Sequence, residues 1–169
     1  MDQSPREIKM NVEISLFRPE HASGFARLNR EWLEEYHLME PSNEEQLADP
    51  QAHFIGHGGQ IFVALHDDEV IGTCAVVPHG VEGWELAKLA VSSDFRGQGI
   101  ARRLVERCIA HAREQDAQRV FLVSNSQLQA ALRLYESFGF KYRALPEVKE
   151  YENEDVYMEL RLDIPEPAA

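Results

Sequence analysis

The chain has 169 residues, of which 44% are hydrophobic and 27% are charged, and its formal net charge is -12. This length and composition predict one globular domain with a full hydrophobic core. The acidic charge argues against nonspecific binding to nucleic acid or to an anionic membrane, because both need a basic protein surface. The same charge attracts cations such as amines, although acidity also simply keeps a protein soluble.

Targeting signals and cysteines are sparse in this sequence. The apolar runs, such as Val70–Pro78, are too short to span a bilayer, and residues 1–10 lack the apolar stretch of a secretion signal. Cys74 falls in a strand-like run and Cys108 on the apolar side of a helix, where small apolar side chains are expected. We therefore expect a cytoplasmic protein in a reducing compartment.

The N-terminal part predicts a strand and a helix. Polar and apolar residues alternate over Asn11–Arg18, which is typical of a strand. Apolar residues at helical spacing predict a helix over Glu20–Tyr36. Segment 37–59 is predicted to be largely irregular, because prolines and a glycine cluster interrupt it, with one short helix at Glu44–Ala48. Irregular segments on a rigid scaffold often carry specificity, so we expect substrate contacts here.

An acidic segment overlaps this region. Residues 31–49 contain seven Asp or Glu and no Lys or Arg. The segment is interpreted either as a lip that receives a cationic amine or as a solvated face. Within it, Glu35 and Tyr36 are the predicted substrate-binding residues.

The middle of the chain predicts a β-meander followed by a crossover. Short turns join three predicted strands, at Gln60–His66, Val70–Pro78 and Trp84–Val91. An amphipathic helix follows, and its apolar face comprises Ile100, Leu104, Val105, Cys108, Ile109 and Ala112. The next strand, Arg119–Val123, completes a strand–helix–strand unit, so the two flanking strands are expected to be parallel.

The C-terminal part predicts one more helix and two strands. Ser126–Gln129 fits a capping box, which predicts a helix start, and Gly139 is its expected C-terminal stop. Strands are predicted from Phe140 to Arg143 and over Val156–Leu162.

A glycine-containing turn, Arg96–Ala101, connects the third meander strand to the amphipathic helix. Its glycines let successive backbone N–H groups face one anion, and the helix N-terminus adds free donors and a positive dipole end. Arg102 and Arg103 add local positive charge. The turn lacks the Gly-Lys-Ser/Thr of a P-loop and the third glycine of the dinucleotide fingerprint, so the residues alone leave the anion open.

The turn resembles the Q/R-x-x-G-x-G/A signature of the Gcn5-related N-acetyltransferase (GNAT) superfamily, with Arg96, Gly99 and Ala101 at matching positions. The later run L-R-L-Y-E-S-F-G-F resembles the second conserved block of that superfamily. The two motifs occur in the right order, and the resemblance extends from about Val12 to the last strand. The stretches Glu85–Val91 and D-V-Y-M-E-L resemble a bacterial branch of the family.

The resemblance implies an α/β fold of the acyl-CoA N-acyltransferase type. It has a mixed, mostly antiparallel sheet of six to seven strands, splayed between the fourth and fifth and flanked by about four helices. One domain would span residues 11–163, between flexible tails at 1–10 and 164–169. The seven histidines show no metal-ligand spacing, and no metal is expected.

The implied activity is acetyl-CoA-dependent N-acetyl transfer to a primary amine of a small molecule or amino acid, by direct attack on the thioester. Two alternatives stay open: acetylation of a protein or peptide amine, and a non-catalytic module that senses an acyl-CoA. The resemblance also allows a homodimer, which no residue of the sequence decides.

The resemblance places coenzyme A along the turn and the strand before it. Backbone N–H groups of the turn would bind the pyrophosphate, and the end of the strand would pair with the pantetheine arm like an added strand. Asn125 is a looser candidate for an amide contact with that arm. The implied cofactor-binding residues are Leu89, Ala90, Val91, Arg96, Gly97, Gln98, Gly99, Ile100, Ala101, Arg102, Asn125 and Tyr135.

Two residues match the acid and the base of the family. Tyr135 matches the tyrosine that protonates the coenzyme A sulfur, the alternative being an ordinary core tyrosine. Glu85 matches the glutamate base of the histone-acetylating branch, the alternative being a surface ion pair at a strand edge. Leu128 stands where many members carry an asparagine, and Lys88 is predicted to be structural or rim-lining.

Overall fold

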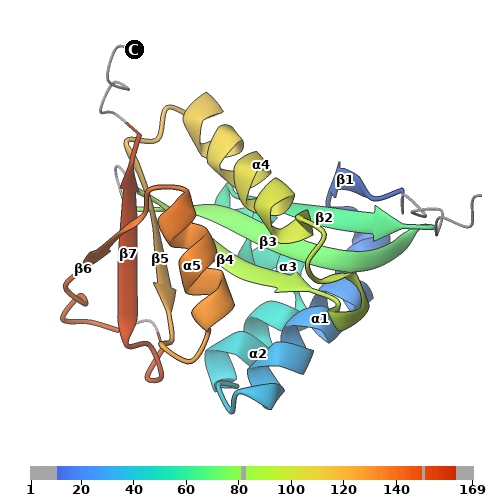
Figure 1. The fold of residues 1–169 in the computed structure, drawn as a ribbon, viewed down its shortest axis with the longest axis horizontal. Helices are drawn as coiled ribbons and strands as arrows, with labels where there is room; N and C mark the ends of the chain where they lie inside the picture. The colour runs from blue at the N-terminus through green and yellow to red at the C-terminus, as the bar shows by residue number, and fades with distance from the viewer. Residues whose placement is uncertain (1–10, 81–82, 150, 163–169) are drawn as a thin grey trace, which may run out of the picture.

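The computed structural model describes residues 11–80, 83–149 and 151–162, which form one mixed sheet with helices on both faces (Figure 1). The strand order is β1-β2-β3-β4-β5-β7-β6. The strands are β1 (Glu13–Leu16), β2 (Gln60–His66), β3 (Glu69–His79), β4 (Gly83–Val91), β5 (Arg119–Ser124), β6 (Lys141–Arg143) and β7 (Val156–Arg161). Apart from the parallel β4–β5 pair, neighbouring strands are antiparallel. The predicted α/β fold class is confirmed.

Two layers of helices cover this sheet. They are α1 (Ala22–Glu35), α2 (Pro41–Ala48), α3 (Pro50–His53), α4 (Ile100–Glu114) and α5 (Gln129–Ser137), with short 3-10 turns η1 (Pro19–His21), η2 (Ile55–His57) and η3 (Ser93–Phe95). Helices α4 and α5 pack on one face with Phe62 of β2, whereas α1 and α2 pack on the other with Ile61 and Val63. Side chains that alternate along β2 therefore pack into two separate cores. None of the helices in the described ranges has the length and apolarity that a bilayer crossing requires.

The β2–β3 hairpin closes through a two-residue turn. Asp67 and Asp68 both have positive φ, at 48° and 64°. Two successive residues of this kind match the type I′ turn, whose twist suits a tight hairpin. The predicted hairpin is confirmed.

The prediction of a largely irregular segment at 37–59 was wrong. Pro41 and Pro50 stand at the first positions of α2 and α3. A proline is tolerated there because the N–H that it lacks would have no partner within the helix. The two prolines therefore begin helices, and the predicted helix at Glu44–Ala48 is the second half of α2.

The capping box predicted at Ser126 is also absent. Helix α5 begins at Gln129, and no side chain caps it. Ser126 instead bonds Asp155, which accepts from its backbone N–H at 2.8 Å and from its hydroxyl at 2.7 Å. The Ser126 hydroxyl, which was expected to cap the helix, thus donates to a carboxylate just before β7. The predicted stop is correct, because Gly139 follows α5 with φ 96°.

Strands β4 and β5 separate soon after they meet. Their parallel pairing joins Gly83 to Arg119, Trp84 to Val120 and Glu85 to Phe121. Past these pairs the strands diverge (Figure 1), and β5 continues alongside β7. The predicted splay between the fourth and fifth strands is confirmed, and it opens the sheet next to Glu85.

Candidate functional site

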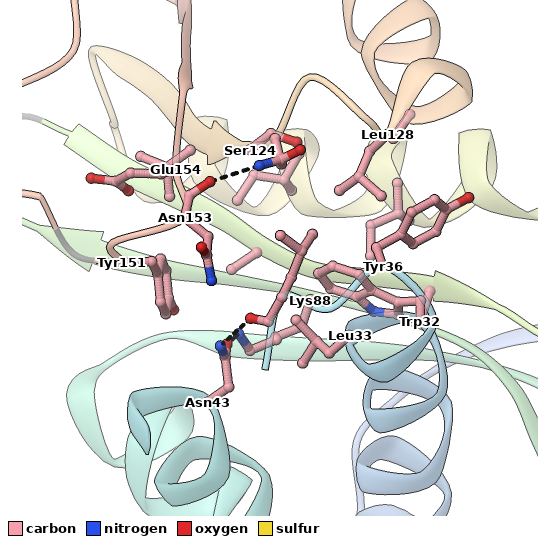
Figure 2. A pocket seen from close by; sticks show the side chains of 18 of the residues that line it. Trp32, Leu33, Tyr36, Asn43, Lys88, Ser124, Leu128, Tyr151, Asn153 and Glu154 are labelled. Atoms are coloured by element: carbon pink, nitrogen blue, oxygen red, sulfur yellow. Dashed lines mark hydrogen bonds between the residues drawn. The ribbon is translucent and has the colours of Figure 1, made fainter. Parts of the chain in front are cut away.

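A cavity of about 280 Å³ lies where β4 and β5 separate. Its walls come from α1, α2, β4, β5, α5 and the segment 151–154 before β7 (Figure 2). Of the residues predicted to form the site, those lining it are Tyr36, Glu85, Leu89, Ala90, Val91, Arg96, Asn125 and Tyr135. Those outside its lining are Glu35, Gly97, Gln98, Gly99, Ile100, Ala101 and Arg102.

A β-bulge in β4 shapes the wall of the cavity. Thr73 of β3 pairs with Ala90, whereas Ala75 pairs with Ala87, so β4 carries one extra residue between these pairs. Lys88, within the bulge, has φ 58°. A left-handed conformation costs a non-glycine residue roughly 1–2 kcal/mol. The surrounding structure must therefore hold the bulge in place.

A chain of buried hydrogen bonds holds it. The Thr73 hydroxyl donates to the Lys88 carbonyl at 2.8 Å. The Asn29 amide donates to the same hydroxyl at 3.0 Å, and the Trp32 indole donates to the Asn29 amide oxygen at 3.0 Å. Both Thr73 and Asn29 are fully buried. These bonds tie α1, β3 and the bulge into one support for the cavity wall.

The bulge brings Lys88 into the cavity together with Glu85. In a regular strand, residues three apart point to opposite faces, so the extra residue is what lets both line one space. The Lys88 ammonium donates to Asn43 Oδ1 at 2.8 Å and lies 5.1 Å from the centre of the Tyr151 ring. The side chain is buried, at 7% exposure. The sequence placed Lys88 in a structural or rim position, and the strand pattern carried no signal for the bulge.

Glu85 sits at the point where the sheet opens. It is the last residue of β4 that pairs with β5, and it lines the cavity. At 4% exposure it is buried, so it does not lie at the surface as the alternative interpretation required. Its carboxylate thus borders the cavity rather than bulk solvent.

Tyr135 approaches from α5 and is buried as well. Its ring packs edge-on against Phe140, with centroids 5.9 Å apart, and it lines the cavity. Burial raises the pKa of the Tyr135 phenol well above its usual value, and the nearby Cys74 and Cys108 thiols add to the rise. The phenol therefore stays protonated at neutral pH and can act as a proton donor. Tyr135 is thus both a core residue and a residue of the cleft, so each of the two interpretations describes its position.

The glycine-containing turn has the backbone form that anion binding needs. Gly97 and Gly99 have φ 77° and 78°, and a Cβ at either would meet nothing within 4 Å. Gly99 caps α4 without a side-chain hydrogen bond, which leaves the first N–H groups of the helix to a ligand. Arg96 lies between this turn and the cavity, with its Nε donating to the Val91 carbonyl at 3.5 Å.

Two arginines after the turn are held by other parts of the fold. Arg102 donates to the Ser137 hydroxyl at 2.9 Å and covers the Phe138 ring, and Arg103 donates to the Val12 carbonyl at 3.1 Å. These contacts tie α4 to α5 and to the chain before β1. A direct role of Arg102 in cofactor binding stays a prediction.

Asn125 is bound both within its own loop and to the segment before β7. Its amide donates to the Asn153 carbonyl at 2.7 Å and accepts from the Gln127 backbone N–H at 3.0 Å. These bonds match the interpretation of Asn125 as a turn residue. Its predicted contact with a pantetheine arm stays a prediction.

Glu40 closes one side of the cavity. It accepts hydrogen bonds from the backbone N–H groups of Glu152, at 2.8 Å, and Asn153, at 3.3 Å. Tyr151 adds a bond from its hydroxyl to Gln46 of α2, at 3.1 Å. Segment 151–154 is thereby fastened to α2 as a wall.

Three other acidic residues of segment 31–49 divide between the two interpretations. Glu31 lines the cavity as Glu40 does. Glu34 and Glu44 instead pair with Arg30 on the surface. In the described ranges, no three His, Cys, Asp or Glu side chains come together in a way that could hold a metal ion.

Comparisons with known proteins agree with this geometry. Residues 25–140 match the model of the acetyltransferase (GNAT) family. A curated relative, N-acetyltransferase family 8 member 2 of Rattus norvegicus, is 34% identical over 103 residues, which cover 58% of this chain and 46% of that protein. The chain thus spans about half the length of the curated relatives that it matches. These relatives are rat and mouse proteins, so the resemblance to a bacterial branch is not borne out.

Solved structures show the same fold. A GNAT-family acetyltransferase of Staphylococcus aureus Mu50 superposes with a TM-score of 0.82 at 16% identity, over 90% of this chain and 99% of that one. A putative acetyltransferase, yncA, of Salmonella typhimurium, described with its cofactor acetyl-CoA, gives 0.72 at 22% identity, over 94% and 98%.

Proposed function

We propose, because this chain belongs to the acetyltransferase (GNAT) family, that it transfers the acetyl group of acetyl-CoA to a primary amine of a small molecule. The observation that carries the proposal is the opening between β4 and β5, whose walls contain both a buried carboxylate and a buried phenol. Acyl transfer to an amine needs a base for the nitrogen and an acid for the leaving sulfur.

The chain's own residues fit coenzyme A in two places. Past Glu85 the inner edge of β4 has no partner strand on its β5 side, so an extended pantetheine arm can pair along Leu89–Val91. The open space at Gly97 and Gly99 admits a pyrophosphate against the N-terminus of α4. When bound, acetyl-CoA supplies the activated acetyl group.

The two buried residues of the cavity supply the base and the acid. Glu85 takes a proton from the acceptor amine, directly or through one water. Tyr135, which keeps its proton at neutral pH, donates that proton to the leaving thiolate. Trp32 and Leu28 line the cavity and limit the access of water, which strengthens polar interactions inside it.

The wall formed by segment 151–154 favours a small acceptor over a polypeptide. Its attachment to Glu40 and Gln46 leaves the acceptor end of the cavity bounded by protein. A panel of amines of increasing length tests this, since a small-molecule enzyme should lose turnover as the acceptor becomes a peptide.

The test of the function is thiol release from acetyl-CoA with an amine panel, together with product masses. We expect thiol release that depends on the amine, and a product heavier by one acetyl group. Glu85→Gln should abolish the acidic limb of the pH–rate profile, whereas the matched surface change Glu34→Gln should preserve it. An unchanged acidic limb in Glu85→Gln would remove Glu85 as the base, and an absence of acetylated product would sink the proposed function.

A further inference from the structure

We infer that the C-terminal half of α1 binds an apolar group of the acceptor, so that the acceptor is a primary amine that carries an aromatic or aliphatic group. The inference rests on the proposed function and names the substrate class of the same cavity. Three features carry it: a stripe of apolar side chains on α1, the hydrogen bond that fixes one of them, and the side of the cavity on which the stripe lies.

A stripe of three apolar side chains runs along α1 up to its C-terminal cap. Leu28, Trp32 and Tyr36 follow one another at intervals of four residues, and all three line the cavity. Residues four apart lie on one face of a helix, so the three side chains present one continuous surface. Leu28 is buried, whereas Trp32 and Tyr36 are half-buried. The stripe thus begins in the core and continues into the wall of the cavity.

The Trp32 indole is fixed by its own hydrogen bond. Its N–H donates to Asn29 Oδ1 at 3.0 Å. Asn29 is fully buried, and its amide donates to the Phe25 carbonyl at 2.9 Å and to the Thr73 hydroxyl at 3.0 Å. An indole has one donor and no acceptor, so this bond uses its polar group. Trp32 therefore presents carbon atoms to the cavity, and these are stabilised by an apolar ligand group rather than by water.

The stripe lies on the side of the cavity away from the proposed cofactor sites. Trp32 and Tyr36 pack with the core under α1 and α2. Leu89, Val91 and Tyr135 pack with the core under α4 and α5 instead. The proposed function assigns the pantetheine arm and its sulfur to these last three residues. The space on the α1 side is therefore left to the acceptor.

The wall that faces the stripe is polar. Figure 2 shows Trp32 and Tyr36 across the cavity from Tyr151 and Asn153. The latter two belong to segment 151–154, which Glu40 holds through two backbone N–H groups. Binding cavities combine apolar walls with a few polar groups that fix the orientation of the ligand. A molecule with one apolar end and one polar end is oriented by two such walls, so its amine lies away from the stripe.

Matched amines test the inference. Propylamine, butylamine and pentylamine differ by one methylene each, and 3-aminopropan-1-ol and 1,4-diaminobutane are polar isosteres of the second and the third. We expect kcat/KM at saturating acetyl-CoA to rise by about fourfold or more for each methylene, the effect of burying one such group. Each polar isostere should fall about tenfold or more below its alkylamine, and 2-phenylethylamine should exceed butylamine.

Two pairs of variants make the result decisive. Trp32→Ala should reduce the methylene effect to about twofold or less, whereas Trp84→Ala, at a partly buried tryptophan outside the cavity lining, should keep it. Tyr36→Ser and the exposed Tyr142→Ser form a second pair, which serves if Trp32→Ala does not fold. If Trp32 only supports α1 or the cofactor, Trp32→Ala would lower kcat/KM for all amines by one factor. An unchanged methylene effect of this kind would overturn the inference.

Fluorescence gives a readout that needs no turnover. The sequence contains two tryptophans, so Trp84→Phe leaves Trp32 as the single one. With coenzyme A in place of acetyl-CoA, pentylamine and 2-phenylethylamine should change the emission of this variant, and the Kd should fall along the methylene series. A Kd that is the same for propylamine and pentylamine would contradict the inference.

The outcomes also separate this inference from the proposed function. Equal kcat/KM values for the alkylamines and their polar isosteres would overturn the apolar group and leave the transferase intact. Acetylation of no amine at all, by a protein that still binds coenzyme A in calorimetry, would overturn both.

Discussion

The polar side chains of the cavity are buried residues held by the fold, and this decides what each can do. Glu85 and Lys88 come from one strand, and Tyr135 comes from a helix on the far side of the opening. All three are less than a tenth exposed. Each is therefore surrounded by protein rather than by bulk solvent.

Replacing the phenol tests the proposed acid. Tyr135→Phe keeps the ring packing against Phe140 and removes only the hydroxyl. We expect kcat to fall by about 10²-fold or more, the range of general acid catalysis, with little change in the Kd of coenzyme A. Steady-state kinetics and calorimetry measure the two. Tyr142→Phe, which removes a surface hydroxyl on β6, is the control, and a wild-type kcat in Tyr135→Phe would exclude the acid role.

The positions of Glu85 and Tyr135 in the cavity could be predicted from the sequence, because each lies at a fixed offset from a recognisable motif. Asn43 and Lys88 could not. The side chain of Asn43 acts across 45 residues of chain, in a helix that starts at a proline, and Lys88 depends on a backbone conformation that its neighbours impose. Propensity and period describe local preference, and these two positions are set by tertiary contacts.

At the scale of elements, the turn before α4 and the bulge in β4 are two irregular features that bear on the site. Regular elements were predictable from their periodicity: α4 buries the face that the spacing indicated, and β2 has the expected bounds. The irregular segment 37–59 was mispredicted because a proline that starts a helix looks like a proline that breaks one. The sequence pattern of an apolar strand contains no signal that predicts a bulge.

Gly99 and Gly80 form a matched pair for testing the turn. Both have positive φ, at 78° and 76°, and a Cβ at either meets nothing within 4 Å. An alanine at either should cost about 1 kcal/mol of stability, from the backbone alone. Gly99→Ala should also weaken coenzyme A binding at least tenfold, because its Cβ occupies the space in front of the α4 N-terminus. Equal Kd values for the two variants would refute the assignment of this turn.

Thr73 tests the support of the bulge. Thr73→Val removes a buried hydroxyl that both donates to Lys88 and accepts from Asn29. Leaving two buried polar groups unsatisfied should lower the free energy of unfolding by about 1–3 kcal/mol and raise the KM for the acceptor. Thr73→Ser, which keeps the hydroxyl, should recover most of both. Urea denaturation and kinetics make the comparison, and a Val variant as stable as the Ser variant would show that the bulge needs no such support.

At the scale of the molecule, the opening in the sheet connects two cores. Tyr135 belongs to the core under α4 and α5, whereas Trp32 and Tyr36 pack with the core under α1 and α2. Residues of both cores line the cavity. The fold class and the splay were predictable from the order of motifs, and the division of the site between two cores was not, because it depends on where each helix packs.

The α4–α5 core predicts how stability depends on pH. Burial, with a hydrogen bond to Cys74, raises the pKa of the Cys108 thiol, and burial raises that of Tyr135. The unfolded chain ionises these groups near about pH 8.5 and 10, while the folded protein keeps them neutral. Stability should therefore be full below about pH 8 and should fall as the pH rises above that value.

Urea unfolding between pH 7 and pH 10 measures this slope. Cys108→Ala should be less stable at every pH, because it leaves a small cavity, and should show a shallower decline above pH 8. Parallel curves for the two proteins would rule out the buried thiol as the cause.

The early separation of β4 from β5 has a consequence for the exchange of amide protons with solvent. An inner strand edge without a partner is a place where main-chain groups are exposed inside the sheet. Peptides covering residues 86–91 should take up deuterium faster than those of the β2–β3 hairpin, and should become protected when coenzyme A is added. The bound arm would act as an interior strand, so the sheet would complete its hydrogen bonding only in the complex.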